Sequence, residues 1–146
     1  MLSLSLLDII IRLGGAAILC GLVGLEREFR HKPAGLRTDM LVGIGTAAMA
    51  VASIEIVRLY PEGNADVSRI ASTILTGIGF IGAGSIIQAK GTVQGLTTAA
   101  SIWVVAAIGL VMGLGMYTLG IAATLMTLMV LVVLHKFQIP ENHDNK

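Results

Sequence analysis

Apolar residues form five long runs along the chain, separated by short polar segments. The runs cover residues 6–25, 40–57, 70–88, 96–113 and 116–134. Each has about 18–20 residues with few ionic side chains, which is enough for a helix to cross about 30 Å of hydrocarbon. The pattern predicts an all-α fold, a membrane bundle of five transmembrane helices in one domain, residues 1–134, with a short polar tail at 135–146.

The most polar part of the chain lies between the first two runs. Residues 26–39 contain seven of the 19 Asp, Glu, Lys and Arg residues, 9 acidic and 10 basic in all. Ionic side chains are costly in hydrocarbon. We therefore expect this whole segment to be an aqueous loop, which fixes the register of the helices on both sides.

The composition supports a membrane protein. Hydrophobic residues make up 55% of the chain and charged residues 13%, and the mean hydropathy is +0.86, whereas soluble domains carry about 25% charged residues. No Lys or Arg precedes Arg12. Because a signal peptide needs a basic start, we expect the first apolar run to be retained as a helix.

The distribution of Lys and Arg predicts the orientation in the membrane. If five helices alternate, seven basic residues fall on the side of the 26–39 loop and the tail, and three fall on the other side. Short loops rich in Lys and Arg stay in the cytoplasm. The sequence therefore predicts a cytoplasmic C-terminus and an N-terminus outside.

Glycine supplies a way to pack the helices. The chain has 18 glycines, and small residues let helix backbones approach closely in lipid. Candidate contact positions are Gly21, Gly24, Gly77, Gly79, Gly82, Gly84 and the GxxxG pair Gly109 and Gly113. Since four of these glycines fall within eight residues of the third run, we expect that helix to be central, kinked and closely approached on more than one face.

Two similar four-residue segments suggest an internal repeat. Residues 35–38 (GLRT) open the second run, and residues 95–98 (GLTT) open the fourth, sixty residues later. One reading is a parallel repeat of two hairpins plus one extra helix, in which Thr38 or Asp39 and Thr98 cap the helices. The other reading is chance, because short strings recur easily in biased compositions.

Polar residues give two groups of candidate functional positions. Carboxylates and guanidinium groups at a helix end can pair, bind a hydrated cation or dock a partner, or the segment can simply set topology. The first group is the polar segment: Glu26, Arg27, Glu28, Lys32, Gly35, Arg37, Thr38 and Asp39. The second lies in or near the apolar runs: Asp8, Arg12, Glu55, Thr97, Thr98, Ser101 and Trp103.

The second group carries specific expectations. Asp8 and Arg12 lie four residues apart, so they share a helix face and can pair. Asp8 and Glu55 could form an outward-facing acidic pair. Trp103 lies too deep for an interfacial belt, so we expect its indole N–H to find a buried partner and the ring to anchor packing.

Other functional classes have weak support. His31, His135 and His143 lie in the polar loop and tail, without metal-ligand spacing, and no nucleophile and base stand out, so we expect no catalytic residues. The net charge of +1 does not favour nucleic acid. Residues 77–82 match GxGxxG but lie inside an apolar run, where a dinucleotide cannot bind. The single Cys20 excludes an internal disulfide and most simply packs as a small apolar residue.

Four ordered motifs resemble the MgtC/SapB family. They are GLVGLERE at residues 21–28, KPAGLRT at 32–38, GIGFIGAG at 77–84 and VQGLTTAASIW at 93–103. The resemblance covers nearly the whole chain and implies the five-helix N-terminal membrane domain of bacterial inner-membrane proteins. Many members add a cytosolic ACT-type domain, which we do not expect here. His is common where Asp39 stands, so a role that needs an imidazole there is weakened.

The resemblance implies a link to magnesium limitation and, in pathogens, to survival inside hosts. Our first hypothesis is a non-enzymatic regulator that contacts another membrane protein, such as the F-type ATP synthase, or a second copy of itself, with a dimer favoured. The alternative is a small oligomeric transporter of magnesium or another cation. No cofactor is expected, although Mg²⁺ is the ion that the acidic residues could bind.

Overall fold

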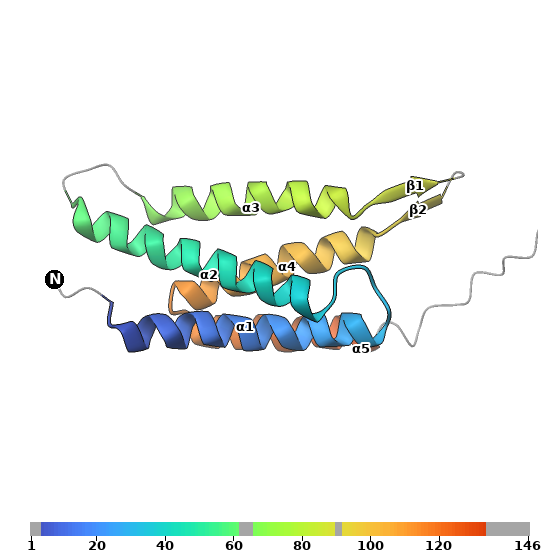
Figure 1. The fold of residues 1–146 in the computed structure, drawn as a ribbon, viewed down its shortest axis with the longest axis horizontal. Helices are drawn as coiled ribbons and strands as arrows, with labels where there is room; N and C mark the ends of the chain where they lie inside the picture. The colour runs from blue at the N-terminus through green and yellow to red at the C-terminus, as the bar shows by residue number, and fades with distance from the viewer. Residues whose placement is uncertain (1–3, 62–65, 90–91, 134–146) are drawn as a thin grey trace, which may run out of the picture.

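The computed structural model describes residues 4–61, 66–89 and 92–133. These residues form α1 (Leu6–Phe29), α2 (Leu36–Leu59), α3 (Val67–Gly84), α4 (Leu96–Gly113) and α5 (Tyr117–Val133), with the short strands β1 (Ile87–Ala89) and β2 (Thr92–Gln94) between α3 and α4 (Figure 1). In the described part, four helices are long and apolar enough to cross a membrane, and α5 is a shorter apolar helix. The predicted all-α membrane bundle is therefore confirmed. The polar tail lies outside the described residues.

The prediction of one aqueous loop over residues 26–39 is wrong at both ends. Helix α1 continues to Phe29 and α2 already begins at Leu36. The helix tolerates the charges because Arg30 pairs with Glu26 one turn earlier, Nε to Oε1 at 3.1 Å. His31 then takes a left-handed φ of 53° and ends α1. The connection is thus only six residues long, 30–35.

The central helix is α4, not α3 as the glycine count predicted. Helix α4 contacts each of the other four helices, whereas α3 lies at the edge of the bundle and packs on α4 and α2 (Figure 1). Helix α4 contains no charged residue, so it can be surrounded by neighbours without burying an unpaired ion. Helix α3 is one continuous α-helix over Val67–Gly84. A high glycine content permits close contact, but it does not supply the neighbour.

The GxxxG pair of the fourth helix lies against α2. A Cβ atom on Gly109 would lie 2.8 Å from the Cα of Gly43, and one on Gly113 would lie 2.8 Å from the Cα of Ala47. Both neighbours belong to α2, so the two backbones nearly touch. Such contact gains dispersion energy that larger side chains would prevent.

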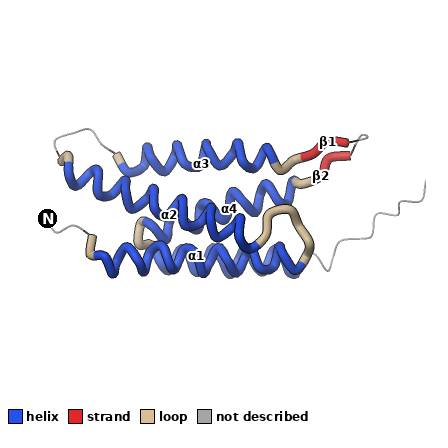
Figure 2. The backbone as a smooth tube through the Cα atoms, in the orientation of Figure 1, coloured by secondary structure: helices blue, strands red, loops and turns tan. Residues whose placement is uncertain are grey.

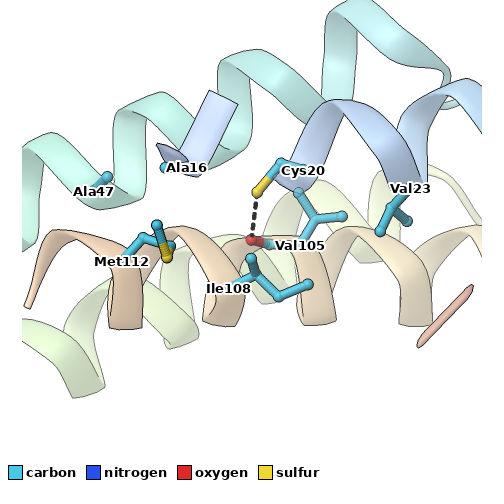
Figure 3. Packing of buried hydrophobic residues seen from close by; sticks show 7 residues of the cluster. All are labelled: Ala16, Cys20, Val23, Ala47, Val105, Ile108 and Met112. Carbon is cyan, nitrogen blue, oxygen red and sulfur yellow. Dashed lines mark hydrogen bonds between the residues drawn. The ribbon is translucent and has the colours of Figure 1, made fainter. Parts of the chain in front are cut away.

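Small and branched side chains fill the centre of the bundle (Figure 3). Cys20 of α1 is buried between α2 and α4, and its thiol donates a hydrogen bond to the carbonyl oxygen of Val105 at 3.4 Å. A Cβ atom on Gly43 would collide with the Cys20 side chain. These contacts agree with Cys20 packing as a small residue. The buried cluster comprises Ala16, Cys20, Val23, Ala47, Val105, Ile108 and Met112.

A β-hairpin joins α3 to α4, where the apolar pattern predicted a helix continuing to residue 88. Strands β1 and β2 are antiparallel, with Gln88 opposite Val93. The hairpin lies at the same end of the bundle as the 30–35 connection (Figure 2). Gly95 follows with a φ of 91°, and any side chain there would collide with the carbonyl oxygen of Ser85. Only glycine fits this turn without strain.

The helix caps differ from those that the repeat predicted. Gly35 is the N-cap of α2 and Gly95 is the N-cap of α4, and neither has a side chain to bond the first turn. Thr38, Asp39 and Thr98 lie inside the helices. Both of the similar segments, 35–38 and 95–98, therefore place a glycine at the start of a helix.

Candidate functional site

Three polar side chains meet inside the bundle at the end that carries the 30–35 connection. Arg27 from α1 is 4% exposed, Asp39 from α2 is 0% exposed and Thr98 from α4 is 3% exposed. The Nη2 atom of Arg27 donates a hydrogen bond to Oγ1 of Thr98 at 3.1 Å, across 71 residues of sequence. We call Arg27, Asp39 and Thr98 the buried polar cluster.

Glycine at the helix crossing brings the cluster together. A Cβ atom on Gly24 would lie 2.9 Å from the Cβ of Asp39 and 2.9 Å from the Cα of Leu36. The last turns of α1 and the first turn of α2 can therefore meet backbone to backbone. The close approach buries Asp39 one turn into α2 and removes it from the surface loop that the sequence predicted.

The buried polar cluster is not fully paired. Oδ1 and Oδ2 of Asp39 and Nε of Arg27 are buried without a hydrogen-bond partner among the described residues. In that part of the chain, ion pairs of 4.0 Å or less join Arg30 to Glu26 and Arg58 to Glu55, and none includes Asp39. More than nine in ten buried polar groups in native proteins have a partner. A buried carboxylate without one marks a candidate functional group.

Glu28, Lys32 and Arg37 of the polar segment lie at the surface beside the cluster, whereas the Glu26 side chain is only 11% exposed and its Oε2 atom is buried without a hydrogen-bond partner among the described residues. Oε2 of Glu28 accepts a hydrogen bond from the Leu36 backbone N–H at 2.9 Å, so α1 supplies the charge that caps α2. A hollow of about 410 Å³ opens there. It is lined by Glu28, His31, Lys32, Pro33, Gly35, Arg37 and Thr38.

At the opposite end, the predicted pairs are replaced by others. Asp8 and Ser5 form a capping box at the start of α1, with the Asp8 N–H donating to Ser5 Oγ at 3.1 Å. The guanidinium of Arg12 instead donates to the Gly113 carbonyl oxygen at 2.7 Å. Glu55 accepts from Arg58 at 2.8 Å. Asp8 and Arg12 therefore form no ion pair of 4.0 Å or less among the described residues, because each bonds another group. Asp8 and Glu55 lie at the same end of the bundle, where they accept from the neighbouring backbone N–H groups of Ser5 and Leu4.

The remaining polar candidates all lie on α4 and differ in their exposure. They are Thr97, Ser101 and Trp103. Oγ of Ser101 donates to the Thr98 carbonyl oxygen at 2.8 Å and is buried. Thr97 is exposed, although it is adjacent in sequence to Thr98. Trp103 is 48% exposed and its indole makes no hydrogen bond to the described residues, so it is not the buried anchor that we predicted.

Two features of the site went unpredicted. Arg27 and Asp39 were assigned to water, because the sequence gives charge but not burial. The pairing of Glu26 with Arg30 could have been found from their spacing of four residues. The described residues include no group of three His, Cys, Asp or Glu side chains placed to hold a metal ion.

Comparison with known proteins agrees with this architecture. The chain is 51% identical over 133 residues to the putative magnesium transporter YhiD of Escherichia coli K12, covering 88% of this chain and 61% of that protein. It is 44% identical over 112 residues to the protein MgtC of Brucella abortus, covering 77% and 45%. With the protein MgtC of Salmonella typhimurium strain 14028s it shares 39% identity over 127 residues, covering 87% and 52%.

The chain thus spans about half to three fifths of the length of these relatives. No solved structure matches it. The model of the MgtC family matches residues 13–139, which include all four sequence motifs and the whole buried polar cluster. The chain is a multi-pass membrane protein that belongs to the MgtC family.

Proposed function

We propose that this protein is a non-enzymatic regulator in the bacterial inner membrane, linked to magnesium limitation and acting through contact with other membrane proteins. The relatives' names connect the family to magnesium. In the five-helix bundle α4 is surrounded, whereas α3 and α5 each pack mainly on two neighbours and lie at the edges, where such contact can form. The N-terminus is outside and the C-terminus cytoplasmic in this proposal.

The observation that carries the proposal is the outer face of α3. A Cβ atom on Gly77, Gly79 or Gly84 would meet nothing within 4 Å. Phe80 on the same helix is 85% exposed and Ile81 is 45% exposed. Glycine in a transmembrane helix is favourable where another backbone comes close, and none of the described residues comes close to these three glycines. A helix from a second copy or from another membrane protein would fill the space.

The partner remains part of the proposal. A second copy is one occupant, and a dimer would bring two α3 helices together. The F-type ATP synthase is the partner that the family resemblance implies. Exposed Lys32 and Arg37 beside the 30–35 connection are placed to add charge-based specificity to either contact.

A transporter of magnesium or another cation is the second candidate function. The name of the YhiD relative favours it. Acidic groups lie near both ends of the bundle, with Asp8 and Glu55 at one end and Glu26 and Glu28 at the other. A single bundle of five helices encloses little room for a path, so such a carrier would act as an oligomer.

Disulfide crosslinking tests the contact through α3. Cys20 is the single cysteine of the chain and is buried, so a new exposed cysteine reports its own contacts. We expect Phe80→Cys to crosslink in native membranes. Leu125→Cys on α5, at a residue 63% exposed, is the matched control and should not crosslink. Equal crosslinking at both positions would indicate random collision and remove support for an α3 interface.

Flux measurements separate the two functions. Liposomes that contain the purified protein should show no Mg²⁺ or proton flux above empty liposomes if the protein is a regulator. Flux that disappears in Asp8→Asn or Glu26→Gln would instead establish transport. Capture of a membrane partner through Phe80→Cys, without flux, would favour regulation.

A further inference from the structure

Asp39 is the most unusual ionisable group in the bundle. Its side chain is completely buried, and neither carboxylate oxygen has a hydrogen-bond partner in the described part of the chain. An ionised carboxylate without hydrogen bonds in an apolar core costs several kcal/mol or more, and such a group commonly becomes neutral instead. Its state of protonation is therefore part of how the helices pack.

The groups around Asp39 can be named helix by helix. Helix α2 packs against α1, α3 and α4. Helix α1 contributes Arg27 and the buried Cys20 thiol. Helix α4 contains no charged residue. The charged residue of α3 is Arg69, near the start of that helix. The start of α3 lies at the end of the bundle away from the start of α2, where Asp39 is (Figure 1). Arg37, on the helix of Asp39, is exposed.

The two nearby acids have partners of their own. Glu28 is exposed and accepts a hydrogen bond from the Leu36 N–H, and Glu26 pairs with Arg30 through Oε1, while its Oε2 atom is buried without a partner among the described residues. His31 and Lys32 are exposed in the connection. In the described part of the chain, Arg27 is thus the cation that is buried beside Asp39.

The position of Arg27 indicates the state of Asp39. The guanidinium donates to the neutral hydroxyl of Thr98 and makes no ion pair within 4.0 Å of Asp39. In a dry core, opposite charges attract strongly, because water does not screen them. An ionised Asp39 would compete with Thr98 for Arg27, whereas a neutral carboxylic acid leaves Arg27 where it lies.

We propose that Asp39 is a buried proton-binding site, neutral in the observed packing, whose deprotonation moves Arg27 from Thr98 to the carboxylate. The carboxylic O–H bond breaks, the proton passes to water at the nearby end of the bundle, and both electrons stay on Asp39. The bond between α1 and α4 is then exchanged for an ion pair between α1 and α2. The protonation state of Asp39 thereby determines whether Arg27 of α1 bonds to α4 or to α2.

Infrared spectroscopy of the full chain in lipid nanodiscs tests the proton directly. We expect the wild type at mildly acidic pH, where exposed aspartates are still ionised, to show a C=O band of a protonated buried carboxyl group. The band should move when the aspartates carry ¹³C at the carboxyl carbon, and it should be missing from Asp39→Asn. Glu28→Gln, which removes an exposed carboxylate, is the matched control and should keep the band. A spectrum without a protonated aspartic acid at mildly acidic pH would overturn the proposal, and the isotope experiment needs no variant to fold.

A pH titration of unfolding provides the second test. Between the pH at which the unfolded carboxyl ionises and the pH at which Asp39 ionises in the fold, unfolding releases one proton. The unfolding equilibrium constant should then rise up to tenfold per pH unit more steeply in the wild type than in Asp39→Asn. Equal slopes would contradict proton binding at Asp39. If Mg²⁺ or Na⁺ removes the carboxyl band at fixed pH in the wild type, the cation displaces a proton that was bound at Asp39, which supports the proposal and identifies a competing ligand.

Discussion

The two glycine-rich helices of this protein have opposite surroundings. Gly109 and Gly113 of α4 lie against the backbone of α2, so that any added side chain would collide. Gly77, Gly79 and Gly84 of α3 meet nothing within 4 Å. The same residue type therefore closes one contact inside the bundle and leaves another face open. The difference teaches that glycine content gives a helix the capacity for close packing, while the neighbours decide whether that capacity is used.

The largest effect should come from filling the closed contact. Gly109→Leu forces a side chain into Thr46 and Gly43 of α2, so the two helices must separate. We expect a loss of at least about 3 kcal/mol in the free energy of unfolding, as for severe overpacking. Unfolding in mixed detergent micelles measures it. The control is Gly45→Leu, since Gly45 lies on α2 with open space around it. Similar losses in both variants would mean that leucine, not the contact, causes the effect.

A smaller effect should follow from removing one polar contact of the buried polar cluster. Thr98→Val keeps the shape of the side chain but deletes the acceptor of Arg27. A buried donor left without its acceptor costs about 1–3 kcal/mol, and the same unfolding assay should report that loss. Thr97→Val changes an exposed residue next to it and should change stability by less than about 0.5 kcal/mol. The prediction fails if the two variants are equally stable.

The first turn of α3, the helix at the edge of the bundle, should lose stability as the pH falls. Asp66 caps α3, and hydrogen bonds from Ser68 lower the pKa of its carboxyl group below the ordinary value. The stability that this cap contributes is present above the unfolded pKa and is lost as the pH falls through the lower folded value. The protection of the amides at the start of α3, measured relative to the intrinsic exchange rate at each pH, should therefore fall on acidification. Asp66→Asn keeps a capping side chain without titrating, so its protection should lack this acid-induced fall.

The smallest effect on the fold should come from the open face. Gly79→Leu adds a side chain where nothing lies within 4 Å, so the unfolding free energy of the isolated protein should change by less than about 0.5 kcal/mol. Crosslinking through Phe80→Cys should nevertheless fall, because the leucine holds a partner helix away. A large loss of stability in isolated Gly79→Leu would show that α3 is packed more tightly than its surroundings indicate.

The sequence predicted the helices well because hydrocarbon imposes one simple rule on length and polarity. Residues 96–113 were predicted to the residue, and α1 was predicted to begin where it does. The ends beside the polar segment were wrong, because Glu26 and Arg30 satisfy each other along the helix and Arg27 is buried against Thr98. The bond between Arg27 and Thr98 spans 71 residues, which local patterns do not contain, whereas the spacing of Glu26 and Arg30 was visible in the sequence. The hairpin of β1 and β2 was missed for a related reason, since its apolar residues continue the pattern of α3.

The candidate site was predicted by identity but not by arrangement. Arg27, Asp39 and Thr98 were all among the chosen residues, because charge inside or beside an apolar run is unusual. Their meeting depends on Gly24, whose missing side chain lets α1 and α2 touch. The sequence marked Gly24 as a packing residue without indicating which polar groups its contact would bury.

The bond between Arg12 and the Gly113 carbonyl oxygen also has a consequence for biosynthesis. Its two residues are 101 positions apart, so at about 5–20 residues per second the ribosome supplies the acceptor roughly 5–20 s after the donor. Until then the guanidinium of Arg12 lacks the Gly113 carbonyl oxygen as an acceptor. The nascent bundle can lock that end only when its fourth helix has been inserted, and earlier intermediates should be more open to proteases that recognise unfinished membrane proteins.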